Sequence, residues 1–381
     1  MLGGKDVELR FRSGVQVAKD HGEMELTIGS RVIGDGHPAL LVAELSANHG
    51  KSLELALETV DAAAEAGADA IKLQTYTPDG MTLNSDKPEF RISSGSLWDG
   101  RTLYDLYSDA YTPWEWHREI FERAQGWDME FFSTPFDAAA ISFLMELRVS
   151  MMKVASFEIT DPHFIFEVAS AGLPIAISTG IATESEITEA VGACHQSGND
   201  QIILTQCSSV YPAKVSDANL RTMVDYRAKY GCLVGYSDHT LGEASTLAAI
   251  ALGAALIEKH FILDKNLDSP DAPFSMDPNE FKAMASNVRS TEEALGSVTY
   301  TLTAEEEANR AFARSLFVVV DVAAGEFLSQ TNVRSIRPGQ GLAPSRLHQL
   351  LGRRFAVDVA AGTPLSDHMV CPPSDTYEPL A

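Results

Sequence analysis

Ionisable and hydroxyl side chains recur at one kind of place in this chain, the end of a short apolar run. Eight runs each turn polar near their C-terminal residues, at 41–50, 70–76, 130–136, 151–158, 174–180, 202–211, 232–240 and 256–263. The polar residues found there include Glu44, Lys72, Gln74, Lys153, Ser156, Glu158, Ser178, Ser208, Ser237, His239, Glu258 and His260. Cations and hydroxyls bind anions, and carboxylates transfer protons. This set predicts an enzyme that acts on an anionic substrate.

The two histidines end consecutive runs, the seventh and the eighth. Neighbouring barrel strands would bring such imidazoles close enough to share one ion, and imidazole pairs suit a divalent metal with open coordination positions. Glu258 lies two residues before His260 and therefore points to the same side of a strand. We expect His239 and His260 to hold a divalent ion near Glu44 and Glu258, with Mn²⁺ as first candidate and Mg²⁺ or Co²⁺ as the others.

Two lysines, Lys72 and Lys153, lie near the ends of the second and fourth runs. They favour an anion site, while a Schiff-base nucleophile and salt bridges at a barrel rim stay open as alternatives. Serines at the ends of the fifth to seventh runs, such as Ser178 and Ser237, add hydroxyl donors that fit a carboxylate or a phosphate.

Helical patterns separate the runs, for example at 52–67 and 185–198. Strands and helices that alternate at this rhythm predict a (β/α)8 TIM barrel, in which the C-terminal strand ends form the active-site floor. The second and third runs are about twice as far apart as the others. Between them stand Trp98, Tyr104, Tyr107, Tyr111, Trp114 and Trp116. These rings either pack beneath a loop or form a lid that contacts a partly apolar substrate.

The 381 residues exceed one barrel, and a repeat lies beyond it, because 318–333 recurs as 355–370. The duplication predicts a small, pseudo-symmetric β-rich domain. We expect an N-terminal extension without an assigned role, a barrel, a linker helix and this second domain, at 1–25, 26–295, 296–312 and 313–375.

Composition narrows the partners and the compartment. The formal net charge of −24 makes nucleic acid and anionic membranes unsuitable partners. Neither a membrane-spanning apolar stretch nor a secretory leader is evident, so we expect a cytoplasmic protein. The four cysteines lack C-x-x-C spacing and are expected to be reduced.

At this level of detail the chain resembles the sialic acid synthase family. The resemblance is carried by ELSANH (44–49), KLQT (72–75), STPF (133–136), KVASFE (153–158), STG (178–180), YSDHT (236–240) and EKHF (258–261). The repeat, with RPGQG at 337–341, resembles that family's C-terminal antifreeze-like (SAF) domain. Within the family, the segments 72–85, 97–107, 112–116 and 153–161 are most similar to the branch that makes pseudaminic acid.

The resemblance implies a metal-dependent condensation of phosphoenolpyruvate with an acyclic amino-sugar aldehyde, giving a nine-carbon keto acid and phosphate. Matched by motif, the metal ligands are His239 and His260. The residues that hold phosphoenolpyruvate are Lys72, Lys153, Ser156, Ser178, Ser208 and Ser237. The residues near the sugar are Gln74, Glu158, Tyr211 and Asp271, and the catalytic candidates are Glu44, Glu258 and Lys153. Arg337 matches an arginine donated to the partner's site, which implies a domain-swapped homodimer.

Other functions stay open at this stage. Ser209 replaces the Asn that N-acetylneuraminate synthases carry in the QCSSVYP segment, which argues against N-acetylmannosamine as acceptor. Legionaminic acid or N-acetylneuraminic acid synthesis is the alternative, and a Schiff-base aldolase using Lys72 or Lys153 is a more remote one. A non-catalytic sugar-binding protein would leave the density of ionisable strand ends unexplained.

Overall fold

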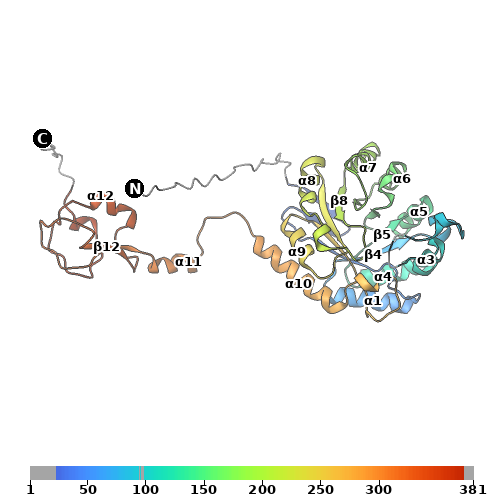
Figure 1. Ribbon diagram of the computed structural model, residues 1–381, viewed down its shortest axis with the longest axis horizontal. Coiled ribbons are helices and arrows are strands. Elements are labelled where there is room, and N and C mark those ends of the chain that lie inside the picture. The colour runs from blue at the N-terminus through green and yellow to red at the C-terminus, as the bar shows by residue number, and fades with distance from the viewer. Residues whose placement is uncertain (1–22, 94, 96–97, 373–381) are drawn as a thin grey trace, which may run out of the picture. The chain divides into compact units, whose positions relative to one another are not determined.

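The computed structural model describes residues 23–93, 95 and 98–372. The chain divides into two compact units that join between Gly296 and Ser297, and each is described by itself (Figure 1). Residues 1–22 of the predicted extension at 1–25 lie outside the described residues, and so do residues 373–375 of the predicted second domain. Over the described residues, none of the helices combines the length and apolarity needed to cross a bilayer.

The first unit is a closed barrel of parallel strands, which confirms the predicted fold class. In the described part of the chain its eight strands are β3 (Leu40–Glu44), β4 (Ala70–Thr75), β5 (Glu130–Pro135), β6 (Met152–Val154), β7 (Ile175–Ser178), β8 (Ile202–Cys207), β9 (Leu233–Asp238) and β10 (Leu256–His260). The strands pair in chain order, and β10 closes the barrel against β3. Six of the eight are buried along their whole length, as helices on the outside require.

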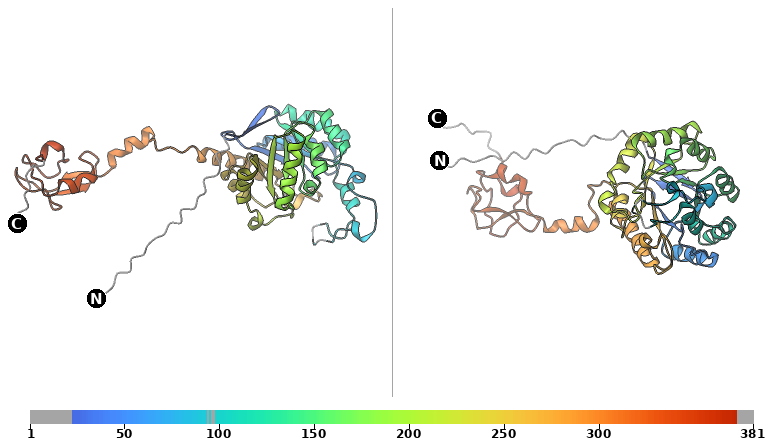
Figure 2. Two further views of the ribbon diagram at one scale, coloured as in Figure 1. Left: turned by 90° about the horizontal axis from the view of Figure 1, so that it is seen from above. Right: turned by 45° about the vertical axis from the view of Figure 1, so that its right-hand side comes forward.

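Helices form an outer ring around the strands (Figure 2). They are α1 (Leu53–Glu65), α4 (His117–Gly126), α5 (Ala138–Leu147), α6 (Pro162–Ala169), α7 (Glu184–Gln196), α8 (Arg221–Tyr230), α9 (Ala244–Ala251) and α10 (Pro278–Leu295). Local sequence sets several of their starts. Thr183 and Glu186 form a capping box on α7, and Asp277 and Glu280 form one on α10.

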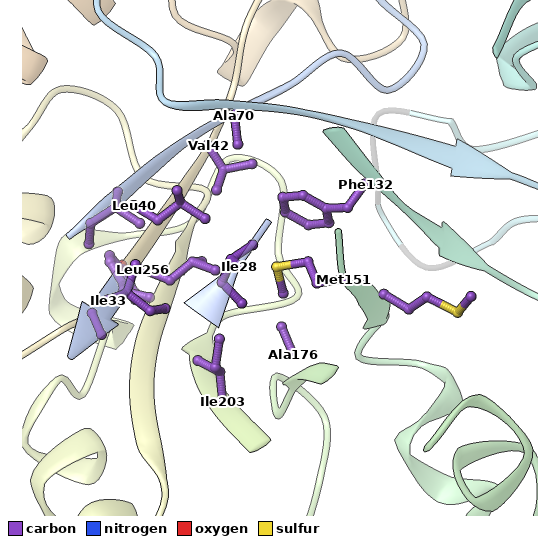
Figure 3. Packing of buried hydrophobic residues seen from close by; sticks show 14 of the residues in the cluster. Ile28, Ile33, Leu40, Val42, Ala70, Phe132, Met151, Ala176, Ile203 and Leu256 are labelled. Carbon is purple, nitrogen blue, oxygen red and sulfur yellow. The ribbon is translucent and has the colours of Figure 1, made fainter. Parts of the chain in front are cut away.

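A β-hairpin that the sequence analysis did not anticipate closes the opposite end of the barrel. Its strands are β1 (Glu25–Ile28) and β2 (Arg31–Gly34). Figure 3 shows Ile28 surrounded by side chains from near the starts of the barrel strands, among them Leu256 and Ile203. The hairpin thus acts as an apolar plug, and it leaves the C-terminal strand ends free for polar groups.

The aromatic segment between β4 and β5 divides its rings between packing and the lining of a cavity. It contains α2 (Pro78–Met81) and α3 (Leu103–Ala110) before α4. Trp114 packs on Phe143, with ring centroids 4.9 Å apart, and Trp116 packs against the barrel core. Trp98 and Tyr107 instead line a cavity described below. Rings late in the segment therefore support the fold, while rings earlier in it face the site.

The second unit has its own core, and the internal repeat builds it. Its elements are α11 (Ala304–Asn309), β11 (Ser315–Val318), β12 (Val333–Ile336) and α12 (Leu347–Leu350), with β11 and β12 antiparallel. Within the expected linker, α11 starts at a capping box of Thr303 and Glu306, and residues 297–303 are not helical. At four positions of the repeat, the residue of each copy is buried in this core: Val318 and Phe355, Val322 and Val359, Leu328 and Leu365, and Val333 and Val370.

Candidate active site

Strand register brings the predicted residues to one end of the barrel. Glu44 is the register partner of His260 on one side and of Lys72 on the other. Ser237 is the partner of Glu258. The pairing of Glu44 with His260 joins the two ends of the barrel sequence, and it exists only because β10 pairs with β3.

Two lysines and two glutamates meet inside the barrel. Lys72 Nζ lies 2.9 Å from Glu44 Oε2 and 3.5 Å from Glu258 Oε1. Lys153 Nζ lies 2.6 Å from the same Glu258 oxygen, which also accepts a 3.0 Å hydrogen bond from the Ser237 hydroxyl. All four charged side chains are at most 5% exposed. The arrangement is a desolvated, alternating set of two ammonium and two carboxylate groups.

The cluster separates the pKa values of its two lysines. Burial lowers the pKa of Lys72, but Glu258 and Glu44 outweigh burial and raise it above its usual range. Burial also lowers the pKa of Lys153, and its neighbours do not offset that effect. For Glu258, burial alone raises the pKa, while the ammonium groups of Lys153 and Lys72 prevail and hold it well below its usual range. Lys72 and Glu258 are therefore an ionised pair at neutral pH.

The two histidines lie beside each other, with ring centroids 5.4 Å apart. The Nδ1 of His239 lies 2.8 Å from the Ser208 carbonyl oxygen, and donation to that oxygen leaves Nε2 with a free lone pair. Burial, and then His260, lower the pKa of His239 to about 3, so this ring is neutral at pH 7. The Nδ1 of His260 lies 3.4 Å from Asp271 Oδ2. A carboxylate behind an imidazole is the usual support for a metal-ligating histidine.

These donors fit one divalent ion with an incomplete protein shell. Two imidazoles, one of them backed by Asp271, leave coordination positions for water or a substrate oxygen. Among the described residues, no group of three or more His, Cys, Asp or Glu side chains is placed to hold a metal by itself. Glu44 and Glu258, expected near the ion, are instead engaged by the lysines.

The predicted serines differ in the hydrogen bonds that their hydroxyl groups make. Ser178 bonds the Thr205 hydroxyl at 3.0 Å, and Ser156 bonds the Ser209 hydroxyl at 2.5 Å. Ser237 lies 3.3 Å from Lys153 Nζ. Ser208 contributes its backbone carbonyl to His239, as described above, and no hydrogen bond of its hydroxyl occurs within the described residues.

A cavity of about 710 Å³ opens beside the histidines. Its polar lining includes Ser46, Gln74, Glu158, Ser209, Tyr211, His260 and Asp271. Its apolar lining includes Met81, Ile92, Leu103, Leu106, Tyr107, Ala110 and Phe136. All four barrel residues predicted near the sugar are in this lining, whereas Lys72, Lys153, Glu44 and Glu258 are not. The structure therefore divides the predicted residues into a charged inner set and a cavity set.

Glu158 is the cavity's unpaired carboxyl group. Its Oε2 is buried without a hydrogen-bond partner among the described residues. Burial raises the pKa of Glu158 to about 7, so a large share of the carboxyl groups carry a proton at neutral pH. A protonated carboxyl group can donate a hydrogen bond, as an amide carbonyl of a ligand requires.

Several supporting residues were missed from sequence. Ser46 bonds Gln74 at 3.0 Å and lines the cavity. The buried Asn48 amide donates to the Phe261 carbonyl and to Ser275, and so holds the loop that carries Asp271. A run of polar residues, SANH at 46–49, directly after an apolar strand was the signal that could have found both.

Arg337 belongs to the second unit, whose placement relative to the barrel is not defined. Its side chain is exposed. None of the described residues forms a hydrogen bond or an ion pair with its guanidinium group. At the barrel mouth, exposed apolar side chains follow four successive strands: Phe157, Ile181, Val210 and Leu241.

Comparison with known proteins agrees with the motifs. Residues 59–300 match the NeuB family, and residues 313–370 match the SAF domain. The resemblance inferred from the sequence is thereby confirmed.

Curated relatives extend over nearly the whole chain. The chain is 46% identical to a pseudaminic acid synthase of Campylobacter jejuni, over 86% of this chain and 95% of the relative. It is equally identical, at 46%, to a pseudaminic acid synthase of Helicobacter pylori, over 86% of this chain and 97% of the relative. An N,N'-diacetyllegionaminic acid synthase of Legionella pneumophila is 36% identical, over 88% and 96% of the two chains.

Among solved structures, the N-acetylneuraminic acid synthetase of Leptospira borgpetersenii, in complex with citrate, superimposes with a TM-score of 0.67 at 32% identity. The match covers 75% of this chain and 95% of that one.

Proposed function

The chain belongs to the NeuB family, and on that premise we propose that it is a pseudaminic acid synthase. It condenses phosphoenolpyruvate with the aldehyde of 2,4-diacetamido-2,4,6-trideoxy-altrose and releases phosphate. The observation that carries the proposal is the pairing of a buried lysine–glutamate cluster with a cavity whose lining combines polar and apolar side chains. The 46% identity to pseudaminic acid synthases supports the choice of product.

The charged inner set suits phosphoenolpyruvate. Lys72 and Lys153 neutralise its phosphate and carboxylate, and hydroxyl groups complete the binding: Ser156, Ser178, Ser208 and Ser237. Because the lysines are already held by Glu44 and Glu258, they are oriented before substrate arrives. Binding in a water-poor site makes each contact stronger than in solution.

The reaction joins two carbons and breaks one carbon–oxygen bond. The methylene carbon of phosphoenolpyruvate attacks the aldehyde carbon, whose oxygen takes up a proton. Water then adds at the neighbouring carbon, which carries the phosphate oxygen, and loses a proton. The tetrahedral species then expels phosphate and leaves the keto group. We assign proton transfer to Glu44 and Glu258. For Glu258 the reason is that its Oε2 is buried and has no hydrogen-bond partner among the described residues. We assign to Lys153 the neutralisation of the departing phosphate.

A divalent ion, Mn²⁺ first and Mg²⁺ or Co²⁺ as alternatives, would supply Lewis-acid polarisation of the aldehyde oxygen. His239 and His260 would hold it. Ser208 orients the first ring through its carbonyl, and Asp271 supports the second. Each imidazole is thus aimed by a contact outside the ion's own ligand set.

The acceptor sugar fits the cavity. Gln74, Tyr211, Asp271 and Glu158 offer polar contacts to hydroxyl and acetamido groups, and a protonated Glu158 can donate to an amide carbonyl. The apolar side, with Leu106 and the other residues of the insertion, suits a C6 methyl group. A methyl placed there rather than a hydroxyl that lacks a partner favours the 6-deoxy sugar by roughly 1–3 kcal/mol.

We further propose a homodimer in which Arg337 of each chain acts in the site of the other. Its guanidinium is exposed and, within the described residues, is free to take an anionic contact. The apolar side chains at the barrel mouth offer a surface for a second copy. The predicted domain limits and the cytoplasmic location belong to the same proposal.

The test is phosphate release with phosphoenolpyruvate and three acceptors: the altrose-configured sugar, its manno epimer and N-acetylmannosamine. We expect the highest kcat/KM with the altrose sugar, loss of turnover after chelation, and recovery with Mn²⁺. Equal or greater efficiency with the manno sugar would overturn the product assignment and leave the family unchanged. A lysine adduct trapped by borohydride, with turnover in metal-free buffer, would instead establish a Schiff-base aldolase.

A further inference from the structure

Behind the two histidines lies a buried ion pair that faces away from the cavity. Asp238 and Lys259 are register partners on β9 and β10, and each directly precedes one of the histidines. Lys259 Nζ lies 2.9 Å from Asp238 Oδ2, and both residues are 1% exposed. Side chains alternate along a strand, so this pair points out of the barrel while Ser237 and Glu258 point in.

The Lys259 ammonium group uses all three of its N–H donors. Besides Asp238, it donates to the Thr240 carbonyl at 2.5 Å and to the Gly242 carbonyl at 3.0 Å. Thr240 directly follows His239. One cation on β10 therefore holds the chain on both sides of the histidine that β9 carries.

The Asp238 carboxylate is equally saturated. It accepts hydrogen bonds from the Thr240 N–H at 2.8 Å, the Thr246 hydroxyl at 2.8 Å and the Ser245 hydroxyl at 3.2 Å, in addition to Lys259. Thr246 and Ser245 belong to α9. The network thus ties β9, β10, the loop between β9 and α9, and the helix into one unit.

We propose that the Asp238–Lys259 pair is a positioning device that sets the spacing and aim of the two histidines. The inference rests on the proposed metal site. Because each member of the pair is joined by one peptide bond to a histidine, a change in their distance moves the two imidazoles relative to each other. Neither residue lines the cavity, so the pair acts on the chemistry through the histidines.

A role in stability alone is a weaker explanation. A buried ion pair is often no more stabilising than apolar residues of the same volume, because both charges must be removed from water. An apolar pair at these positions would pack between strand and helix, but it would not hold the Thr240 and Gly242 carbonyls. The saturated geometry is what an apolar pair cannot reproduce.

The test compares wild-type enzyme with Lys259→Met and with the milder Thr246→Val, which removes one hydroxyl donor to Asp238. Arg289→Met is the matched control, since Arg289 bonds Asp69 at 2.5 Å beside the other end of the barrel. Mn²⁺ affinity of the metal-free proteins is measured by electron paramagnetic resonance, with thermal unfolding and phosphate-release kinetics alongside. His239→Ala marks the loss of the metal site.

We expect Lys259→Met to weaken Mn²⁺ binding at least tenfold and to lower kcat, with part of the kcat regained at saturating Mn²⁺. Thr246→Val should weaken binding two- to fivefold, and Arg289→Met should leave affinity and kcat unchanged. A Lys259→Met protein that unfolds at lower temperature yet keeps wild-type affinity and kcat would reduce the pair to a structural role. If Lys259→Met does not fold, wild-type affinity and kcat in Thr246→Val overturn the proposal. Wild-type Mn²⁺ affinity in His239→Ala would identify the metal site itself as the error.

Discussion

At the C-terminal end of the barrel, the side chains of Lys72, Lys153 and Glu258 are at most 5% exposed and contact one another. At the N-terminal end, Asp69 pairs with Arg31 and Arg289, but both arginine side chains are 34% exposed. The two ends thus carry similar charges in different surroundings. A half-exposed pair is screened by water and adds little, whereas a buried cluster is costly to assemble and strong once formed.

The apolar plug explains how one molecule tolerates both arrangements. Ile28 and Ile33 of the hairpin are buried in the core, so the N-terminal end contributes hydrophobic stabilisation. The C-terminal end instead holds a buried cluster of charged side chains. In this fold the strand C-termini serve chemistry and the N-termini serve stability.

The largest effect is expected from a substitution that breaks the buried lysine–glutamate cluster. Within the described residues, Lys153→Met leaves Glu258 with the longer Lys72 contact as its one ion pair. Removing one partner of a buried charge pair costs about 3–5 kcal/mol of unfolding free energy. Phosphate release should fall at least about a thousandfold, as removal of a preorganised electrostatic contact does. Adding Glu258→Gln should restore much of the stability, measured by urea unfolding, but none of the activity. Recovery of activity in the double variant would show that the charges are not catalytic.

The second-largest effect is expected at Arg337 of the second unit, whose proposed role neither end of the barrel can fulfil. Arg337→Ala and Lys72→Ala should each lose most activity as pure dimers. Mixed and allowed to exchange, they should regain about a quarter of wild-type turnover, because random pairing places one intact site in half of the dimers. Subunit exchange proven by mass spectrometry without any return of activity would contradict the shared site.

A pH-dependent effect follows from the unpaired carboxyl group of the C-terminal end. The pKa of Glu158 is raised from 4.5 to about 7 in the folded protein. Stability from this group is therefore fully present below pH 4.5 and is lost as pH rises through about 7, by up to about 3 kcal/mol.

Glu158→Gln should flatten the stability profile across this window and be more stable than wild type at pH 8. Urea unfolding between pH 4.5 and 8 measures it. The same substitution at Glu130, which bonds Ser30 at the N-terminal end, controls for the chemical change. If the free energy of unfolding of Glu158→Gln changes with pH as steeply as that of the wild type, another group causes the pH dependence.

The smallest effect is expected at the N-terminal ion pairs. Asp69→Asn removes the charge shared by Arg31 and Arg289 and should cost about 1 kcal/mol or less. Its kcat and KM should match wild type, since the substitution lies at the end opposite the site. If Asp69→Asn folds normally but loses turnover, the proposed separation between a catalytic C-terminal end and a stabilising N-terminal end is contradicted.

Sequence patterns predicted the barrel because each strand is a short apolar run that ends in polar residues. The residues of the inner set lie at those ends, so they were found directly. The hairpin plug was missed because its two strands are four residues each and resemble a surface turn. The SANH stretch marks Ser46 and Asn48 as polar residues after a strand, but their roles depend on distant partners such as Phe261, which the stretch does not identify.

The sequence by itself determined the alternation of strands and helices, the repeat that builds the second core, and the residue types at the strand ends. Only the tertiary structure decided which of those residues share a site. Lys153 and Glu258 are 105 residues apart in the chain, and they meet because the barrel closes. Likewise, closure separates the lysine–glutamate cluster from the cavity, since depth within a barrel depends on register rather than on any local pattern. Local propensity is set by neighbours in the chain, whereas burial, pKa and contact distance are set by neighbours in space.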